Sequence, residues 1–171
     1  GDWDLSQHQK FSKQDMSYFD EEIKEKYIPW VIETSGGVDR AVLFFLVDAY
    51  SEEKDPAKNG ASRVVLKLNP KLAPYKAAVF PLLANKPQLV EKAKEVYQML
   101  KTNDLTVAWD DRGNIGKRYY SQDEIGTPFC ITVDFDSLKK DDVTVRDRDT
   151  MKQERIKIKE LSSFIGKTIL K

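Results

Sequence analysis

The sequence predicts an α/β fold in which a sheet is covered by helices. Residues 77–83 form a fully apolar run, which is typical of a buried parallel strand. A second apolar strand is predicted at 128–133, after two segments with helical periodicity. Strands and helices therefore alternate along residues 64–133, and this order favours a sheet packed against helices.

The N-terminal third has a different texture. Residues 1–26 are polar and aromatic, without a clear periodicity. The predicted elements that follow are a short strand at residues 31–32, a glycine break at 36–37, a helix over 38–50 and a linker over 51–62. The helix is apolar nearly all round, so we expect it to be buried in a larger body.

The remaining elements follow from turn residues and apolar spacing. Leu89, Ala93, Val96 and Leu100 recur at helical spacing after Pro87, which suits a first helical turn. The predicted elements are strands at 64–68, 77–83, 105–109, 128–133 and 143–147, and helices at about 87–102 and 115–125, the second ending at Gly126. The charged run 152–160 is interpreted as the solvated face of a helix, and Leu161, Phe164 and Ile165 as apolar positions of the tail.

Composition limits the kinds of partner. The 171 residues carry 28 basic and 28 acidic side chains, so the formal net charge is zero. No global basic field exists to drive non-specific nucleic-acid binding, and any RNA contact must come from a local patch. No apolar run is long enough for a membrane span and the N-terminus has no signal pattern, so we expect a cytoplasmic protein without a membrane partner.

Cysteine and histidine are too rare for a disulfide framework or a metal centre. Cys130 is the single cysteine, and its place in an apolar run predicts a small buried side chain. His8 is the single histidine and has no second histidine or cysteine near it. We therefore expect no metal site.

One segment combines a strand, two glycines and an arginine at a helix start. Residues 27–40 read Tyr-Ile-Pro-Trp-Val-Ile-Glu-Thr-Ser-Gly-Gly-Val-Asp-Arg. The glycines let the backbone approach a ligand, and the guanidinium of Arg40 suits phosphate. This segment resembles motif 3 of the class II aminoacyl-tRNA synthetases, in the version used by glycyl-tRNA synthetases.

A second resemblance extends over the C-terminal part. The stretches at 115–128, 133–136 and 143–156 are similar to the anticodon-binding domain of dimeric glycyl-tRNA synthetases. The resemblance implies that residues 1–58 are the C-terminal end of a class II catalytic domain and that 59–171 are an anticodon-binding domain. It implies a mixed, largely parallel five-stranded sheet covered by helices, preceded by a strand–helix remnant of the antiparallel catalytic sheet.

The resemblance also implies an activity and its substrates. Glycyl-tRNA synthetases activate glycine with ATP and Mg²⁺ and transfer it to the 3′ end of glycine tRNA. The expected partners are therefore the tRNA anticodon stem-loop, ATP and glycine, with a homodimer for the intact enzyme and no DNA. Motifs 1 and 2 are absent from this sequence, so the chain alone is expected to be inactive and to hold no cofactor tightly.

The resemblance assigns roles around the glycine turn. Arg40 would grip the γ-phosphate of ATP and act in catalysis, with Gly37 beside the nucleotide. Glu33 would bind the α-ammonium of glycine, and Ser35 would add a hydrogen bond. Thr34 stands where the family has proline. The alternative for Arg40 is a salt bridge at the helix start, although a cation is unfavourable there unless an anion is bound.

Basic and aromatic side chains lie together at the start of the 115–125 helix. Lys117 and Arg118 precede Tyr119 and Tyr120, which is a combination suited to RNA, with charge for phosphate and rings for unstacked bases. The alternative is that one tyrosine belongs to the core and the cations are solvated.

Further charged residues are candidates for anticodon recognition. Asp123 and Glu124 could accept hydrogen bonds from the amino groups of cytosine, in which the glycine anticodon is rich. Arg146 and Arg148 could reach base edges or phosphate. Equally, Asp147 and Asp149 could pair with these arginines and fix their orientation.

Two other functions use the same scaffold. One is a non-catalytic accessory protein, such as the processivity subunit of the mitochondrial DNA polymerase. The presence of Glu33, Ser35 and Arg40 argues against it, because such a subunit needs no phosphate-binding arginine. The other is a free-standing anticodon-domain paralogue, which would leave the apolar helix at 38–50 with nothing to pack against.

Overall fold

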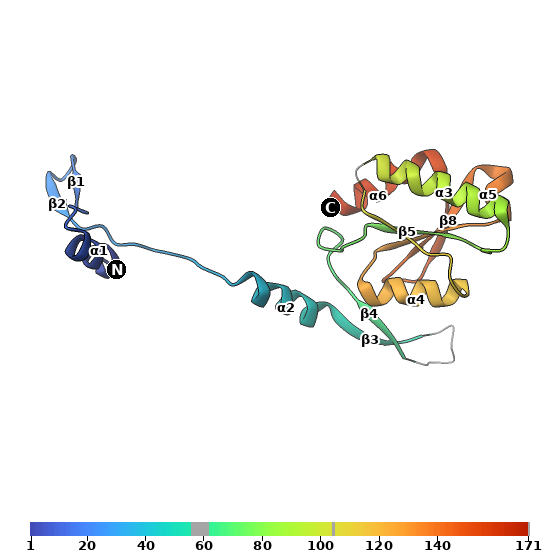
Figure 1. The fold of residues 1–171 in the computed structure, drawn as a ribbon, viewed down its shortest axis with the longest axis horizontal. Helices are drawn as coiled ribbons and strands as arrows, with labels where there is room; N and C mark the ends of the chain where they lie inside the picture. Colours follow the sequence, from blue (N-terminus) through green and yellow to red (C-terminus); the bar gives the residue numbers. More distant parts are fainter. Residues whose placement is uncertain (56–61, 104, 171) are drawn as a thin grey trace. The chain divides into compact units, whose positions relative to one another are not determined.

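The fold was analysed in a computed structural model that describes residues 1–55, 62–103 and 105–170. The chain divides into two compact units, Gly1–Ala41 and Val42–Lys171 (Figure 1). The predicted domain boundary at 58/59 lies outside the described residues.

The first unit contains one helix and one short hairpin. Helix α1 (Trp3–Ser12) is followed by β1 (Tyr18–Asp20) and β2 (Glu25–Tyr27), which pair in antiparallel fashion. The strand predicted at residues 31–32 is wrong, because this segment is not in a strand and Ile32 is 92% exposed. Val31 exchanges backbone hydrogen bonds with Gly1 only, at 2.8 and 3.2 Å, which does not extend into a ladder.

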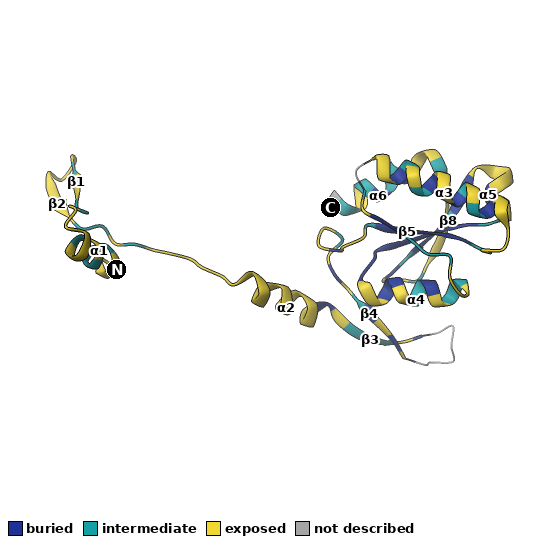
Figure 2. Cartoon of the chain, viewed as in Figure 1, coloured by how far each residue is buried: buried dark blue, intermediate teal, exposed yellow. Residues whose placement is uncertain are grey.

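The predicted apolar helix is present as α2 (Val38–Ala49). The expectation that it is buried is wrong for this chain, because every residue from 42 to 47 is exposed (Figure 2). A helix that is apolar nearly all round needs neighbours on several sides. Here Val42, Phe45 and Leu46 line an apolar groove together with residues of the 66–74 segment and Ile125, and the other faces are open in the described residues.

A hairpin follows α2 directly. Strand β3 (Tyr50–Lys54) pairs antiparallel with β4 (Ser62–Leu66), so the linker predicted for 51–62 is a strand over its first part. Residues 56–61 lie outside the described residues. Composition missed β3 because its polar side chains alternate between half-buried and exposed and its backbone is satisfied by β4.

The centre of the second unit is a five-stranded mixed sheet, as predicted. Its strands lie in the order β6-β5-β7-β8-β9. Strand β5 pairs in parallel with β6 and β7, whereas β8 runs antiparallel to both β7 and β9. Four strands therefore share one direction. The strand bounds are β5 (Ala77–Pro81), β6 (Val107–Trp109), β7 (Phe129–Val133), β8 (Asp142–Asp147) and β9 (Gln153–Lys157).

Helices cover both faces of this sheet. Figure 1 shows α3 (Pro87–Thr102), α5 (Phe135–Lys140) and α6 (Leu161–Leu170) on one face and α4 (Ile115–Ile125) on the other. A short 3₁₀ turn, Ile158–Glu160, leads into α6. Within the described ranges, each helix is too short or too polar to cross a bilayer.

The core is split by the sheet into two layers. Under α3 and α6, the helical positions Leu89, Ala93, Val96 and Leu100 are all buried, as their spacing predicted. Under α4, the side chain of Cys130 is buried beside Phe80. Burial raises the pKa of the Cys130 thiol, since the thiolate would lose its hydration.

Three local features differ from or refine the prediction. The run 152–160 contains β9 rather than a helix. Ile156 is buried on β9, whereas its neighbours are exposed. Helix α5 was not predicted, although Asp134 and Ser137 form a capping box at its start. Gly126 ends α4 with φ of +83°, and a Cβ there would lie 2.9 Å from the carbonyl oxygen of Leu66. This position therefore requires glycine.

Candidate nucleic-acid interface

The residues assigned to ATP and glycine lie together in sequence on the first unit. Glu33, Ser35 and Gly37 are exposed on the irregular segment before α2, and Arg40 is exposed in its first turn. Gly37 begins the helical hydrogen bonding, since its carbonyl accepts from the N–H of Ala41 at 3.0 Å. Their roles toward ATP and glycine stay predictions.

Four of the six residues assigned to the anticodon are buried. Arg118, Asp123, Arg146 and Arg148 are each 2% exposed or less, whereas Lys117 and Glu124 are exposed on α4. A side chain without surface cannot contact RNA in this conformation. The four buried groups are instead bonded to protein atoms.

Arg118 clamps the loop that follows β6. Its guanidinium donates to the carbonyl oxygens of Asp111, Arg112 and Gly113 at 2.9–3.0 Å. It also donates to the carbonyl oxygen of Pro81 at the end of β5, at 2.6 Å. Arg118 therefore holds the carboxyl ends of two neighbouring strands together.

Asp123 is the centre of a buried ion network. Its carboxylate accepts from Arg146 of β8 at 2.8 and 3.0 Å and from Arg63 of β4 at 2.9 Å. Arg63 also donates to Glu53 of β3 at 2.6 Å. Charge-assisted bonds of this kind join α4 to the sheet and to the β3–β4 hairpin.

Arg148 has the structural partners that the alternative interpretation proposed. Its guanidinium bonds the carboxylate of Asp149 at 2.7 and 3.0 Å, and it donates to the carbonyl oxygens of Leu68 and Gly126, both at 2.9 Å. Asp147 does not pair with Arg146; it accepts from the backbone and hydroxyl of Thr150.

The two tyrosines of α4 differ in their surroundings. The Tyr119 hydroxyl lies 2.7 Å from that of Thr132, and the guanidinium of Arg146 lies 4.9 Å from the centre of its ring. Burial raises the pKa of Tyr119, which agrees with the interpretation that one tyrosine belongs to the core. Tyr120 donates to the carboxylate of Asp55, next to the hairpin.

Exposed polar and aromatic groups lie at the carboxyl ends of the parallel strands. The loop after β6 leads to Asn114, whose side chain caps α4 by accepting from the N–H of Lys117 at 2.9 Å. The N–H of Leu82 donates to the carbonyl oxygen of Val133 at 2.8 Å, which keeps the ends of β5 and β7 adjacent. Phe135 follows β7 and is 44% exposed. Ligands of α/β proteins commonly bind at such an edge.

A salt-bridge cluster borders this carboxyl edge. Arg155 of β9 bonds Asp134 at 2.6 Å and also Asp142, from its Nε at 3.0 Å and from a second nitrogen. Burial raises the pKa of Asp134, but the bonds from Arg155 and Ser137 outweigh it, so the net shift is downward. The bond from Arg155 also lowers the pKa of Asp142. Both carboxylates are therefore held in the charged form.

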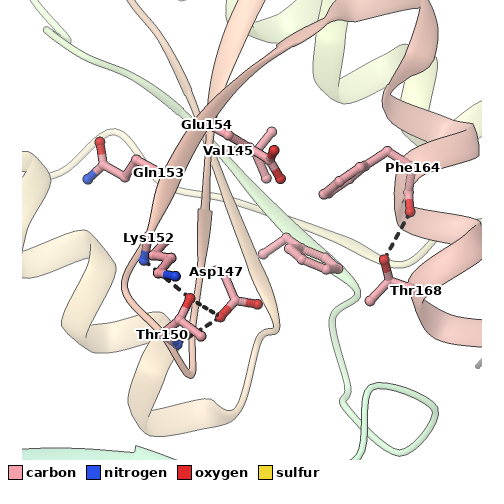
Figure 3. Close-up of a pocket in the computed structure, with 9 residues that line it drawn as sticks. Val145, Asp147, Thr150, Lys152, Gln153, Glu154, Phe164 and Thr168 are labelled. Carbon is pink, nitrogen blue, oxygen red and sulfur yellow. Dashed lines mark hydrogen bonds between the residues drawn. The ribbon is translucent and has the colours of Figure 1, made fainter.

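A separate cleft of about 440 Å³ lies at the opposite end of β7 (Figure 3). Val145 and Phe164 contribute apolar surface, and Asp147, Thr150 and Lys152 line its polar side. The Asp147 carboxylate already accepts hydrogen bonds from the N–H and the hydroxyl of Thr150. Elsewhere too, the described residues contain no group of three or more acidic, histidine or cysteine side chains that could hold a metal ion.

Comparison with known families decides the relationship. Residues 76–168, the part that forms the five-stranded sheet and its helices, match the family described as "Anticodon binding domain". The chain belongs to the anticodon-binding domain family. The match begins just before β5 and ends within α6.

Sequence similarity to related proteins extends over both units of the chain. It is 54% identical over 168 residues to a glycine–tRNA ligase of Clostridium kluyveri, covering 98% of this chain and 35% of the relative. It is 50% identical over 171 residues to one of Streptomyces coelicolor, covering 99% of this chain and 37% of the relative. The chain thus spans about a third of the length of these relatives.

Solved structures give the same classification. A prolyl-tRNA synthetase of Cryptosporidium parvum complexed with L-proline and AMP is 29% identical, with a TM-score of 0.58, over 62% of this chain and 24% of that one. The same enzyme complexed with halofuginone and AMPPNP matches with a TM-score of 0.57. The mixed sheet of this anticodon-binding domain chain is therefore shared with class II synthetases.

Sequence reasoning missed several exposed residues of the carboxyl edge. Asn114, Phe135 and Arg155 were not singled out, and neither was the buried Arg63. The capping residues Asn114 and Asp134 were the available signals, because each marks the start of a helix at this edge of the sheet. Arg63 had no local signal, since its partner Asp123 lies 60 positions away.

Proposed function

We propose that this chain is the anticodon-recognising part of a glycine–tRNA ligase. The observation that carries the proposal is the identity of 50–54% to two glycine–tRNA ligases across both units, together with the anticodon-binding family match. Glycine, ATP with Mg²⁺ and glycine tRNA are the proposed substrates of the whole protein. The proposal extends to a homodimer that works in the cytoplasm.

The proposed RNA surface is the carboxyl edge of the sheet. Lys117 supplies positive charge, Phe135 offers an open ring for stacking, and Asn114 and Arg155 supply polar groups. Stacking and selective hydrogen bonds are better suited to binding an unstacked anticodon loop than to binding a duplex, because single-stranded bases expose their Watson–Crick edges.

The buried charged residues are proposed to position this surface rather than to contact RNA. Arg118 fixes the backbone of residues 111–113, and Asp123 with Arg146 fixes α4 on the sheet. Arg148 holds the end of α4 through the carbonyl oxygen of Gly126. Glu124 is exposed at the far end of α4 and stays a candidate for contact with the tRNA.

The first unit is proposed to contribute to the catalytic site of the whole protein. Glu33 and Ser35 would hold glycine, and Gly37 and Arg40 would hold ATP. Their exposure in this chain supports that role, since the side chains are available to a ligand and to further protein segments.

The test is the binding of two anticodon stem-loops by fluorescence anisotropy. One carries a glycine anticodon, and the other has its cytosines replaced. We expect the first to bind about 5- to 150-fold more tightly, because one good base contact is worth about 1–3 kcal/mol. We expect Lys117→Ala to weaken both, whereas Lys94→Ala, an exposed lysine on α3, leaves both unchanged.

The salt dependence of stem-loop affinity is a second measurement that tests the proposal. The exposed cations at the edge are Arg112, Lys117 and Arg155. If each neutralises one phosphate, the slope of log affinity against log salt concentration should be roughly −2, at about −0.7 per neutralised phosphate. Equal binding of both stem-loops, or a steep slope for both, would contradict anticodon recognition and indicate a general polyanion site.

A further inference from the structure

A second cleft runs along the outer edge of the sheet. It has a volume of about 560 Å³, within the range of sites that hold small organic groups. Rings of Tyr75, Tyr97 and Trp109 line it, and Tyr97 meets Trp109 edge to face with 5.8 Å between ring centres. It extends from Tyr75, two residues before β5, to the loop after β6, so it adjoins the carboxyl edge.

The cleft offers open backbone as well as aromatic surface. Among the described strands, β6 pairs with β5 alone, so its other edge presents unpaired N–H and C=O groups. Tyr75 is 39% exposed, which leaves ring surface free for a ligand. A flat ring with hydrogen-bonding edges can use both kinds of surface at once.

Positively charged side chains lie beside the aromatic surface. The side chain of Arg112 is 90% exposed, yet its Nε and its backbone N–H both donate to the Asp110 carboxylate, at 3.3 and 3.0 Å. Its carbonyl oxygen is held by Arg118 at 2.9 Å. On α3, the Nζ of Lys101 lies 5.4 Å from the centre of the Tyr97 ring. Rings flanked by an exposed arginine and a lysine suit a base together with its phosphates.

We propose that this cleft, defined by Tyr75, Trp109 and Arg112, binds one unstacked nucleotide of the RNA loop whose anticodon occupies the carboxyl edge. The inference rests on the proposed function and adds a subsite to it. A peptide that joined the sheet as an extra strand is a poorer occupant, because β6 has only three residues for pairing. Arg112 lies at the carboxyl edge and also lines the cleft. An RNA strand that passes from the edge into the cleft would therefore stay close to a positive charge.

The first test removes the aromatic ring of Tyr75 from the cleft. Tyr75→Ala should weaken the glycine anticodon stem-loop about 5- to 150-fold, as for loss of one base–aromatic stack. Tyr75→Phe, which keeps the ring, should bind like the parent chain. Tyr50→Ala, an exposed tyrosine outside the cleft, is the matched control and should also bind like the parent.

A set of stem-loops, each abasic at one loop position, identifies the nucleotide. At one position outside the anticodon, the abasic change should weaken the parent chain but add nothing to Tyr75→Ala, because both remove the same contact. If the abasic and Tyr75→Ala effects add at every position, the cleft holds no base and the inference is overturned.

Tryptophan emission supplies a signal that a purely structural role would not change. With Trp3→Phe and Trp30→Phe, Trp109 is the single tryptophan of the chain. We expect its emission to fall saturably with the RNA, and Arg112→Gln to shift the titration to higher RNA. Unchanged emission at saturation overturns the cleft alone, whereas no stem-loop binding at all overturns the proposed function as well.

Discussion

Replacing Asp123 with asparagine tests whether this residue supports the fold or recognises RNA. Its side chain has no exposed surface and accepts three bonds of 2.8–3.0 Å from Arg63 and Arg146. An asparagine side chain would keep the shape but leave the buried guanidinium of Arg146 without a counter-charge and that of Arg63 with Glu53 alone. Breaking a buried ion pair from one side costs about 3–5 kcal/mol. We therefore expect the free energy of unfolding to fall by about that amount.

The assay is denaturant unfolding followed by circular dichroism, with the midpoint and slope fitted separately. The expected loss corresponds to about 12–20 °C in thermal midpoint, at about 4 °C per kcal/mol for a unit of this size. Glu124→Gln changes the next residue, which is exposed, and should stay within about 0.5 kcal/mol of the parent. A loss below about 1 kcal/mol for Asp123→Asn would refute the reasoning, because it would mean that water or another group solvates the Arg146 guanidinium.

The same variant distinguishes support from base recognition. At a temperature where Asp123→Asn is still folded, its preference for the glycine anticodon should match that of the parent chain. A flattened preference in the folded variant would instead return Asp123 to the role of a cytosine acceptor.

Two further predictions concern Gly126 and Arg155. Gly126→Ala should destabilise the fold by more than about 1 kcal/mol, and by more than Gly113→Ala, because both positions have positive φ but only Gly126 has a backbone oxygen 2.9 Å from the added Cβ; equal midpoints for the two variants would contradict this. Arg155→Gln should destabilise at pH 7, because Arg155 lowers the pKa of Asp134 and Asp142 and so adds stability that is complete above their ordinary value of 3.8. That difference in unfolding midpoint should shrink as the pH falls below 3.8 through the lowered pKa values, and a constant difference down to pH 2 would contradict the assignment.

The elements that sequence predicted well are those whose signal is local. Helix α3 has its apolar residues at helical spacing, and α4 lies between an asparagine cap and a glycine end. Strand β5 is apolar throughout, and β7 is apolar except for Thr132, because both faces of these strands are covered. Each of these patterns is complete within a window of about ten to sixteen residues.

The elements that sequence missed depend on distant partners. Strand β9 is mostly charged and is a strand because β8 pairs with it, with Ile156 opposite Val143. Burial of α2 was expected from composition, but its residues 42–47 are exposed in the described part of the chain. A polar strand and an exposed apolar helix are both decided by what lies beside them, which local periodicity does not contain.

The burial of the candidate anticodon residues was missed in the sequence analysis for the same reason. RNA contact and local pairing were equal alternatives for Arg146 and Arg148, because their partners Asp123 and the carbonyl oxygen of Leu68 lie 23 and 80 positions away. A charge in a one-dimensional sequence has no burial, so surface and interior arginines look alike. The nearby alternative, Asp149 beside Arg148, was visible from sequence and proved correct.

Burial of these arginines is consistent with the selectivity for RNA that we propose for this neutral chain. Arg63, Arg118, Arg146 and Arg148 place four of the 28 basic side chains inside the protein. The surface therefore lacks the dense positive field that attracts any polyanion. Affinity must then come from stacking and from a few fixed donors such as Arg112, and these contacts form only where a base is unstacked. The interior cations supply rigidity to the loop that presents those donors, so the same residue type contributes to recognition from within the fold.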